Sequence, residues 1–309
     1  MKFTFRQLEY FVAAAEAGSI AAAAERIHIS APSISVAITQ LEQQLGVLLF
    51  IRQRNGLSLT TVGQDVLERA NSLLEEASAL HAAVNQQDTE LKGRVTLGCL
   101  TTLAPMVMPE LVQSWAKMHP AVVVELVEDT QDQLISHLRR GVVDVAITYE
   151  MHIPPDLEFE TLASLPPLLM MPANHRLSRQ TRIDLQDVVN DDYILLDLPY
   201  SRDYFLSVFQ HAGLTPRIGM RTTQMDVVRT MVANGLGVSV VVSRPLNEAA
   251  LDGKPIVSVP IANRMPLLSV GVLVRRAQET TLIAAFRQHA RASIGDDYIP
   301  GMRPLSVEE

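Results

Sequence analysis

The chain has 309 residues. A single hydrophobic core is rarely found in a domain of this length, so two or three domains are expected. Hydrophobic residues make up 48% and charged residues 19%, which is typical of a well-packed globular protein. The net charge of -8 opposes binding to nucleic acid through overall charge. A single cysteine, Cys99, excludes an intramolecular disulfide and a cysteine-rich metal site. The sequence shows no signal peptide or membrane-spanning segment, and we expect a cytoplasmic protein.

The first thirty residues carry start and stop signals for two short helices. Thr4 and Gln7 form a capping-box pattern that opens the first helix, and Gly18 is expected to end it in the left-handed conformation. Ser19 then caps a second helix over Ile20–Arg26, whose alanines permit the close approach of a neighbouring helix.

A third helix is predicted to begin after Ser30 and to end at Gly46. Its apolar positions repeat at the helical period and predict one buried face, formed by Ile34, Ile38, Leu41 and Leu45. The opposite face has short or polar side chains and no acidic group: Pro32, Ser33, Val36, Thr39, Gln40 and Gln43. A helix that lies in the major groove needs such a face, because carboxylates would meet phosphate. The alternative is a small helical bundle whose helices pack together without binding DNA.

A hairpin is predicted directly after this helix. Apolar runs at Leu48–Phe50 and Leu57–Leu59 flank a segment containing Asn55-Gly56, which is the strongest short hairpin signal. Arg52 and Arg54 lie in this segment, where we expect them to stand beside the DNA backbone as part of a wing.

Residues Phe5–Gly63 resemble the N-terminal domain of LysR-type transcriptional regulators almost without gaps. The segments that carry the resemblance are Leu8–Ala13, Glu16–Ser19, Ala22–Glu25, Ser30–Ser35, Leu41-Glu42, Leu45-Gly46, Leu49-Phe50, Arg52 and Leu59–Gly63. The resemblance implies a winged helix-turn-helix over about Ile20 to Thr39 that binds a palindromic site in double-stranded DNA. The residues expected at the DNA interface are Ser30, Ala31, Pro32, Ser33, Ser35, Val36, Thr39, Gln40, Arg52 and Arg54.

Two residues depart from the pattern of the family. Ala31 stands where the family usually has glutamine, and Val36 stands where it usually has arginine or another polar residue. We expect this pair to favour apolar contact with thymine methyl groups over hydrogen bonds. We therefore hypothesise less direct reading of bases and more dependence on DNA shape.

A long helix is predicted from Thr61 to about Asn85. It carries a heptad repeat whose members are Val66, Ala70, Leu73, Ala77, Leu80 and Val84. Such a repeat favours pairing with a partner helix, and the alternative is a helix packed on its own domain. The resemblance implies that LysR-type regulators dimerise through this helix, which fixes the distance between two recognition helices. The polar segment Gln86–Glu90 is expected to be a hinge.

From Lys92 onward, strands and helices alternate. Strands are expected at Arg94–Leu97, Val122–Val127, Val143–Ile147, Leu168–Met171, Tyr193–Leu196, Val238–Val242, Val257–Val259 and Leu268–Val274. Helices are expected at Pro109–Met118, Gln131–Arg140, Arg202–Ala212, Thr223–Asn234 and Thr280–Arg291. The βαβ pattern predicts parallel sheets in two lobes with a cleft between them.

Polar residues cluster where helices begin beside this cleft. Thr101-Thr102, Ser201-Arg202 and Thr222-Thr223-Gln224 are the three clusters, and Tyr149 follows a strand at the exit of the first lobe. Each cluster taken alone fits a helix cap, whereas their convergence favours a ligand site. The expected effector-binding residues are Thr101, Thr102, Tyr149, Ser201, Arg202 and Thr223. Arg202 is the only cation among them and favours a carboxylate-bearing effector, the alternative being a surface arginine.

The resemblance extends more weakly over the rest of the chain. Residues 141–147 and 231–238 are similar to two recurring stretches of the family's effector domain. The implied fold is an α+β multidomain protein whose two-lobed α/β effector domain resembles periplasmic solute-binding proteins. The expected parts are a head at 1–60, a linker helix and hinge at 61–91, lobe I at 92–160 completed by 266–294, lobe II at 161–265, and a loose tail at 295–309.

Motifs for catalysis and cofactor binding are not found. The sequence has no glycine-rich phosphate loop, no paired metal-ligand histidines and no nucleophile elbow, so we expect neither an enzyme nor a cofactor. Cys99 ends an apolar strand and is expected to be a buried structural thiol.

A homodimer or homotetramer that binds DNA and a small-molecule effector is the expected form, with RNA polymerase a further candidate partner. The alternatives are a transport or enzyme module on the same two-lobed fold, and a DNA-bending protein without effector.

Overall fold

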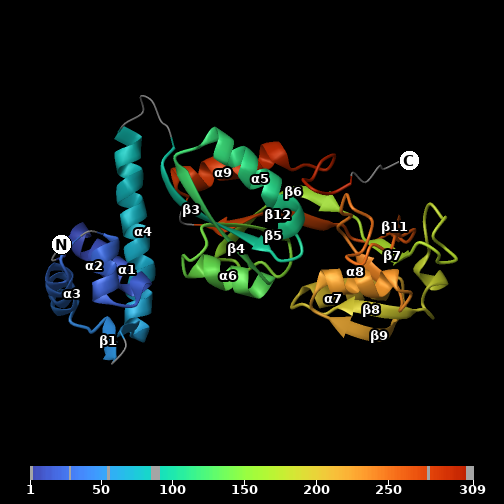
Figure 1. The fold of residues 1–309 in the computed structure, drawn as a ribbon, viewed down its shortest axis with the longest axis horizontal. Helices are drawn as coiled ribbons and strands as arrows, with labels where there is room; N and C mark the ends of the chain where they lie inside the picture. The colour runs from blue at the N-terminus through green and yellow to red at the C-terminus, as the bar shows by residue number, and fades with distance from the viewer. Residues whose placement is uncertain (1–2, 28, 54–55, 85–90, 277–278, 304–309) are drawn as a thin grey trace. The chain divides into compact units, whose positions relative to one another are not determined.

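The computed structural model describes residues 3–27, 29–53, 56–84, 91–276 and 279–303 (Figure 1). The chain forms two compact units, Met1–Thr89 and Glu90–Glu309. Each unit has a hydrophobic core of its own. No helix among the described residues is long and apolar enough to cross a membrane.

The first unit is a helical domain with a hairpin. Its elements are α1 (Phe5–Ala17), α2 (Ile20–Arg26), α3 (Ala31–Leu45), β1 (Phe50–Gln53), β2 (Gly56–Leu59) and α4 (Thr61–Val84). The predicted caps form: Thr4 and Gln7 make both hydrogen bonds of the capping box, and Ser19 and Ser30 accept from backbone N–H groups of the next turn. Strands β1 and β2 pair antiparallel, with Phe50 opposite Leu59.

The core of the first unit combines small and large apolar residues. Fully buried members from four different segments are Phe11, Ala14, Ala23, Ile34, Leu41 and Leu49. The alanines of α2 let it lie close to α1 and α3, which it contacts. Gly63 is required where α4 begins, because a Cβ atom there would lie 2.1 Å from the carbonyl oxygen of Leu49.

Helix α4 packs on this core with part of its heptad repeat. Ala70 is only 1% exposed and belongs to the core, and Val66 packs against the core from its edge. Leu73 is 39% exposed, whereas Ala77 is half-buried. The side chains of Leu80 and Val84 lie outside the described part of the chain. The expectation that the whole repeat faces a partner is therefore wrong for Ala70, because α1 contacts α4 over this stretch.

The second unit begins with lobe I, a five-stranded sheet in the order β4-β3-β5-β12-β6. The strands are β3 (Gly93–Leu100), β4 (Val122–Asp129), β5 (Val145–Tyr149), β6 (Leu157–Leu165) and β12 (Leu268–Arg275). Strands β4 and β5 pair with β3 in parallel, as the βαβ pattern predicts. However, β12 pairs antiparallel with both β5 and β6, so the sheet is mixed rather than parallel.

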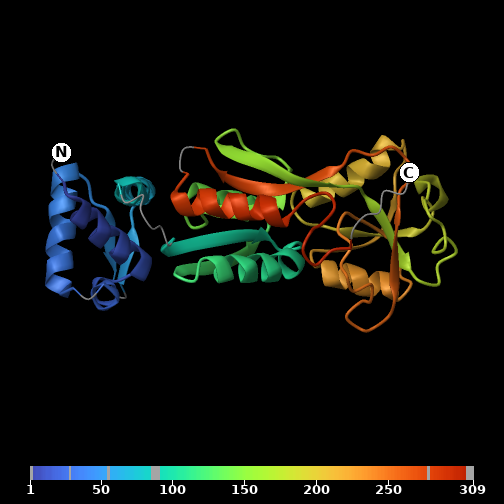
Figure 2. The same cartoon turned by 90° about the horizontal axis from the view of Figure 1, so that it is seen from above.

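Helices cover both faces of this sheet. Helices α5 (Ala104–Met118) and α9 (Thr281–Ser293) contact each other, and α6 (Gln131–Arg139) packs against β3, β5 and β12 on the opposite face (Figures 1 and 2). Helix α5 starts at Ala104 rather than at Pro109, which lies inside the helix. The backbone N–H groups of a first turn have no partner within the helix, and Pro105 suits that position.

Lobe II contains two smaller sheets. A three-stranded sheet has the order β10-β7-β11, and β8 pairs with β9 in parallel. The strands are β7 (Leu168–Pro172), β8 (Asp192–Leu196), β9 (Arg217–Thr222), β10 (Ser239–Val241) and β11 (Ile256–Pro260). A short 3-10 turn, η1 (Leu185–Asp187), precedes β8, and helices α7 (Ser201–His211) and α8 (Met225–Ala233) pack against β8.

The segment after α9 is packed against the second unit rather than loose. Ile299 and Met302 are buried, and Met302 pairs with Pro245 across a β-bridge. Gly301 has a positive φ of 70°, and a Cβ atom there would lie 2.6 Å from the carbonyl oxygen of Met106. The expectation of a loose tail is thus wrong for residues 295–303, because this segment seals apolar surface. Residues 304–309 lie outside the described residues.

Candidate DNA-binding and effector sites

The face of α3 opposite the core is exposed, as the helical periodicity predicts. Pro32, Ser33, Thr39 and Gln40 are exposed, and Val36 is 56% exposed near the middle of the helix. Of the expected buried face, Ile34, Ile38 and Leu41 are buried, whereas Leu45 is exposed in the last turn. The helix therefore offers a narrow, uncharged and largely polar surface.

Several polar groups on this face are already used within the protein. The Ser30 hydroxyl caps the helix and lies 2.7 Å from the Ser33 hydroxyl. The Thr39 hydroxyl donates to the carbonyl of Ser35, and the Gln40 side chain accepts from Gln7 of α1 at 3.3 Å. These bonds fix the orientation of the side chains, and they leave Val36 as a protruding apolar contact.

Two of the sequence-predicted DNA contacts are less accessible than expected. Ala31 is half-buried and packs against the core of the first unit, because it lies on the side of α3 that faces the other helices. Ser35 is half-buried as well. The backbone of Arg52 lies in β1, its side chain is outside the described part of the chain, and Arg54 lies outside the described residues altogether.

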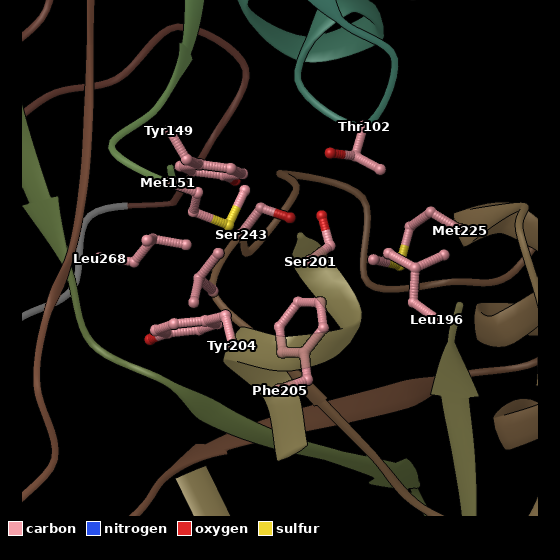
Figure 3. Close-up of a pocket in the computed structure, with 11 residues that line it drawn as sticks. Thr102, Tyr149, Met151, Leu196, Ser201, Tyr204, Phe205, Met225, Ser243 and Leu268 are labelled. Carbon is pink, nitrogen blue, oxygen red and sulfur yellow. The ribbon is translucent and has the colours of Figure 1, made fainter. Parts of the chain in front are cut away.

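A small pocket opens between the two lobes of the second unit (Figure 3). Thr102 of the β3–α5 turn, Tyr149 at the end of β5 and Ser201 at the start of α7 line it, together with Ser243 and Met225. Figure 3 shows the side chains of Thr102, Ser201 and Ser243 directed toward the same space. Its volume of about 10 Å³ has room for roughly one water molecule. Three of the residues predicted from the sequence, Thr102, Tyr149 and Ser201, therefore line one pocket.

The backbone around Tyr200 places Ser201 in this pocket. Tyr200 has φ 63° and ψ -43°, and the N–H of Ser201 donates to the carbonyl of Pro199 at 2.8 Å. This is a γ-turn with the strained sign of φ, which turns the chain sharply into α7. Ser201 is buried as a result, at the first position of a helix whose N-terminus faces the pocket.

The lobe I wall is held in place by Gln131. Its side-chain amide donates to the carbonyls of Tyr149 at 3.0 Å and Met151 at 2.9 Å. Its carbonyl accepts from the Thr148 hydroxyl. Burial raises the pKa of Tyr149 above its usual range, so the phenol stays neutral.

A larger cavity of about 330 Å³ adjoins the first pocket and shares Thr102, Met225 and Ser243 with it. The predicted residues Thr101 and Thr223 line this cavity and not the first pocket. Its lining also includes Arg229 and Asp226, on α8, and Asn247 in the loop after β10. Sequence reasoning missed Arg229, although it lies one turn beyond the polar cluster at residues 222–224.

Arg202 takes no part in either cavity. It is 46% exposed and forms an ion pair with Asp197 at 3.0 Å and with Asp203 at 3.6 Å. Its side chain lies on the outer surface of α7, because Ser201 occupies the inward position. The prediction of Arg202 as the effector-binding cation is therefore wrong, and the alternative of a surface arginine holds.

The one cysteine is unsuited to redox or metal chemistry. Cys99 is fully buried, and burial raises the pKa of its thiol well above the usual range. No group of three or more His, Cys, Asp or Glu side chains among the described residues is arranged to hold a metal ion.

A winged helix-turn-helix domain followed by a two-lobed α/β domain with an internal cavity defines a ligand-responsive DNA-binding regulator. Residues 5–64 match the model for bacterial regulatory helix-turn-helix proteins of the lysR family, and residues 88–295 match the LysR substrate binding domain. The chain belongs to the LysR family of transcriptional regulators, which confirms the resemblance and the fold class.

Similar proteins of known sequence or structure are regulators as well. HinK, a LysR family transcriptional regulator from Pseudomonas aeruginosa, is 34% identical, with 95% of this chain and 99% of that chain covered and a TM-score of 0.64. CbnR complexed with its target DNA is 27% identical over 94% of this chain and 99% of that chain, with a TM-score of 0.57. A hydrogen peroxide-inducible genes activator from Dickeya chrysanthemi is 26% identical, over 92% and 95% of the two chains.

Proposed function

We propose that a small carboxylate-bearing metabolite, bound between the two lobes of the second unit, controls this regulator. The observation that carries the proposal is the cavity of about 330 Å³, within the range of small-molecule sites, next to a pocket rich in hydroxyl groups. Arg229 supplies the cation that a carboxylate needs, in place of the predicted Arg202. Ligand contacts with both lobes would shift the equilibrium between their arrangements.

We infer that oxidation of a cysteine pair is not the signal. A disulfide within the chain needs two cysteines, and the single Cys99 is fully buried, out of reach of a thiol of another copy. The similarity to hydrogen peroxide-inducible activators therefore supports the fold and the DNA-binding role, and not a thiol-based response of this chain.

For the DNA-binding head we propose contacts through the exposed face of α3 and through the wing. Val36 would meet thymine methyl groups, and Pro32, Ser33, Thr39 and Gln40 would line the groove beside it. The negative charge of the chain, -8, makes a single head a weak binder, so two heads on a palindromic site are needed. Homodimers or homotetramers formed through the exposed part of α4 would place them, in the cytoplasm, with RNA polymerase as a further partner.

A footprinting experiment tests this function with the full chain. DNA from upstream of its own gene is expected to show two protected half-sites about one helical turn or a multiple apart, with affinity that falls steeply as salt rises. A panel of small carboxylates is then added, and at least one is expected to change the affinity or the protected length. Absence of any protein–DNA complex at low salt would refute the proposal for the head, and an unchanged footprint with every carboxylate would refute that for the effector.

A further inference from the structure

Arg229 is a buried cation with no carboxylate in direct contact among the described residues. It is 9% exposed, and its Nη2 donates to the carbonyls of Asn247 at 2.8 Å and Ala249 at 3.0 Å. Glu248 lies close enough to raise the pKa of Arg229, but it forms ion pairs with Arg244 at 2.7 Å and Arg303 at 3.5 Å. Burial lowers the pKa of the guanidinium, which reflects the cost of holding this charge away from water.

The remaining nitrogens of Arg229 have no partner among the described residues. Its Nε and Nη1 have no acceptor within the described part of the chain, and neither is among the fully enclosed polar atoms that lack a partner. Arg229 lines the cavity of about 330 Å³. A guanidinium anchored to carbonyls through one nitrogen, with two more that have no acceptor among the described residues, is suited to donate a charge-assisted hydrogen bond to the carboxylate of a ligand in the cavity.

Asp226 stands in the same cavity, three residues earlier on α8. Its carboxylate is exposed, makes no direct ion pair or side-chain hydrogen bond with the other described residues, and lies close enough to influence the charge of Arg229. A ligand with only a carboxylate at Arg229 would be repelled by Asp226, whereas a ligand with an ammonium group beside its carboxylate would be attracted by both.

We infer that the cavity between the α5 and α8 N-termini selects an amino carboxylate, such as a free α-amino acid, with its carboxylate on Arg229 and its ammonium group on Asp226. This inference rests on the proposed function and names the chemical class of its effector. Thr101 and Thr102 of lobe I line the same cavity, as does Ser243 of lobe II, so both lobes contribute to the site. Because the first pocket has room for about one water molecule, the ligand occupies the larger cavity.

The test uses the full-length chain and thermal-shift and calorimetric titrations with matched compounds. The panel contains the free amino acids, each paired with the same molecule lacking the amine and the same molecule lacking the carboxylate, for example L-alanine, propionate and ethylamine. At least one amino acid is expected to bind, with affinity at least tenfold above those of both of its partners. Binding of a simple carboxylate as tight as that of its amino acid would overturn the inference and leave the proposed function standing. Absence of binding by every amino acid would overturn the inference as well.

Two variants separate the roles of the charges. Asp226→Asn is expected to weaken binding of the amino acid about tenfold and to leave propionate-type binding unchanged or tighter, which a merely structural effect would not do. Arg229→Lys keeps the positive charge but loses the guanidinium that the carbonyls of Asn247 and Ala249 hold in position, and it is expected to weaken binding of all carboxylates at least tenfold. Arg221→Gln removes an exposed arginine of lobe II that lines neither cavity, and it is the control. Equal binding by Asp226→Asn and the unmodified chain would refute the role of Asp226.

Discussion

The rings of His152 and Tyr200 stack on each other, with centroids 4.5 Å apart and planes inclined by 19°. Both residues have a positive φ, 50° and 63°, which residues other than glycine rarely adopt. His152 follows Met151, and Tyr200 precedes Ser201, so each strained residue adjoins one that lines the first pocket. The stack thus joins the β5–β6 connection of lobe I to the start of α7 beside the first pocket, and backbone strain is commonly stored at functional sites.

Substitutions of His152 are expected to separate strain from stacking. His152→Val should lower the free energy of unfolding by about 1–3 kcal/mol, because a branched side chain resists positive φ and the stack is lost. His152→Gly should change it by less than about 1 kcal/mol, since relief of strain offsets the lost stack. Urea unfolding of the full chain measures both values. Equal losses of unfolding free energy in the two variants would show that the positive φ of His152 does not destabilise the folded state.

Val36 is expected to contribute to DNA affinity through thymine methyl groups. Val36→Ala removes two methyl groups and should weaken binding to the preferred site about tenfold, with little change for unrelated DNA. Fluorescence anisotropy at fixed salt measures this difference. Replacement of the contacted thymines by deoxyuridine, which lacks the methyl group, should remove most of the difference between Val36→Ala and the unmodified chain.

The exposed side chain of Val142 in the second unit provides a matched control for this experiment. Val142→Ala makes the same chemical change outside the head and should leave DNA affinity unchanged. If Val36→Ala weakens the thymine and deoxyuridine sites equally, apolar contact with methyl groups is not the source of its effect.

Helix α4 is expected to divide its heptad positions between packing and assembly. Ala70→Leu places a larger side chain in the closed core of the head and should lower its free energy of unfolding by about 1–3 kcal/mol. Leu73→Lys puts a charge on the exposed side and should reduce the assembly to a smaller species without unfolding the head. Light scattering after size-exclusion chromatography measures the mass, and an unchanged mass for Leu73→Lys would place the interface elsewhere.

The stability of the second unit is expected to fall at acid pH through His289. Burial, followed by the nearby His119, lowers the pKa of this residue, and its Nε2 lies 3.1 Å from the carbonyl of Leu111 and 3.0 Å from the Ser114 hydroxyl. Because the unfolded chain takes up the proton more readily, stability decreases as pH falls below about 6.5 toward the lower pKa of the folded state. Unfolding between pH 7.5 and 5 should therefore depend on pH less steeply in His289→Gln. Identical slopes would exclude His289 as the group responsible.

Local signals in the sequence predicted much of the head. Ser19 and Ser30 cap helices through hydrogen bonds within the next turn, and Gly18 and Gly46 end helices through their own backbone conformation. None of these interactions depends on distant residues. The same holds for the exposure of Val36, which follows from the helical period alone.

Long-range pairing explains what the sequence did not reveal. Arg202 lies at the surface, where it forms an ion pair with Asp197. Arg229 is buried and donates to carbonyl groups about twenty residues later in the chain. Strand β6 was missed because Glu158 and Glu160 interrupt its apolar pattern. A strand with such charges can be predicted only if their ion-pair partner is known, and here the partner lies more than 120 residues away in the sequence.

That partner is Arg287 of α9, which is 11% exposed and bridges the helix to β6. It forms ion pairs with Glu158 at 2.8 Å, Glu160 at 2.9 Å and Glu279 at 2.8 Å. Arg287→Ala would leave Glu158 and Glu279 without this cation and Glu160 with Arg291 alone, and the free energy of unfolding should fall by about 2–4 kcal/mol, measured in urea at pH 7.

Arg139 offers the matched control, since it pairs with Asp156 through two hydrogen bonds of 2.8 and 2.6 Å but is half exposed. Arg139→Ala should cost less than about 1 kcal/mol, because water and salt already screen that pair. Added salt should reduce the loss for Arg287→Ala, since ions screen the repulsion among the carboxylates that Arg287 no longer bridges. If the two variants lose equal stability, burial does not set the strength of the Arg287 cluster, and β6 would have to be held by its pairing with β12 alone.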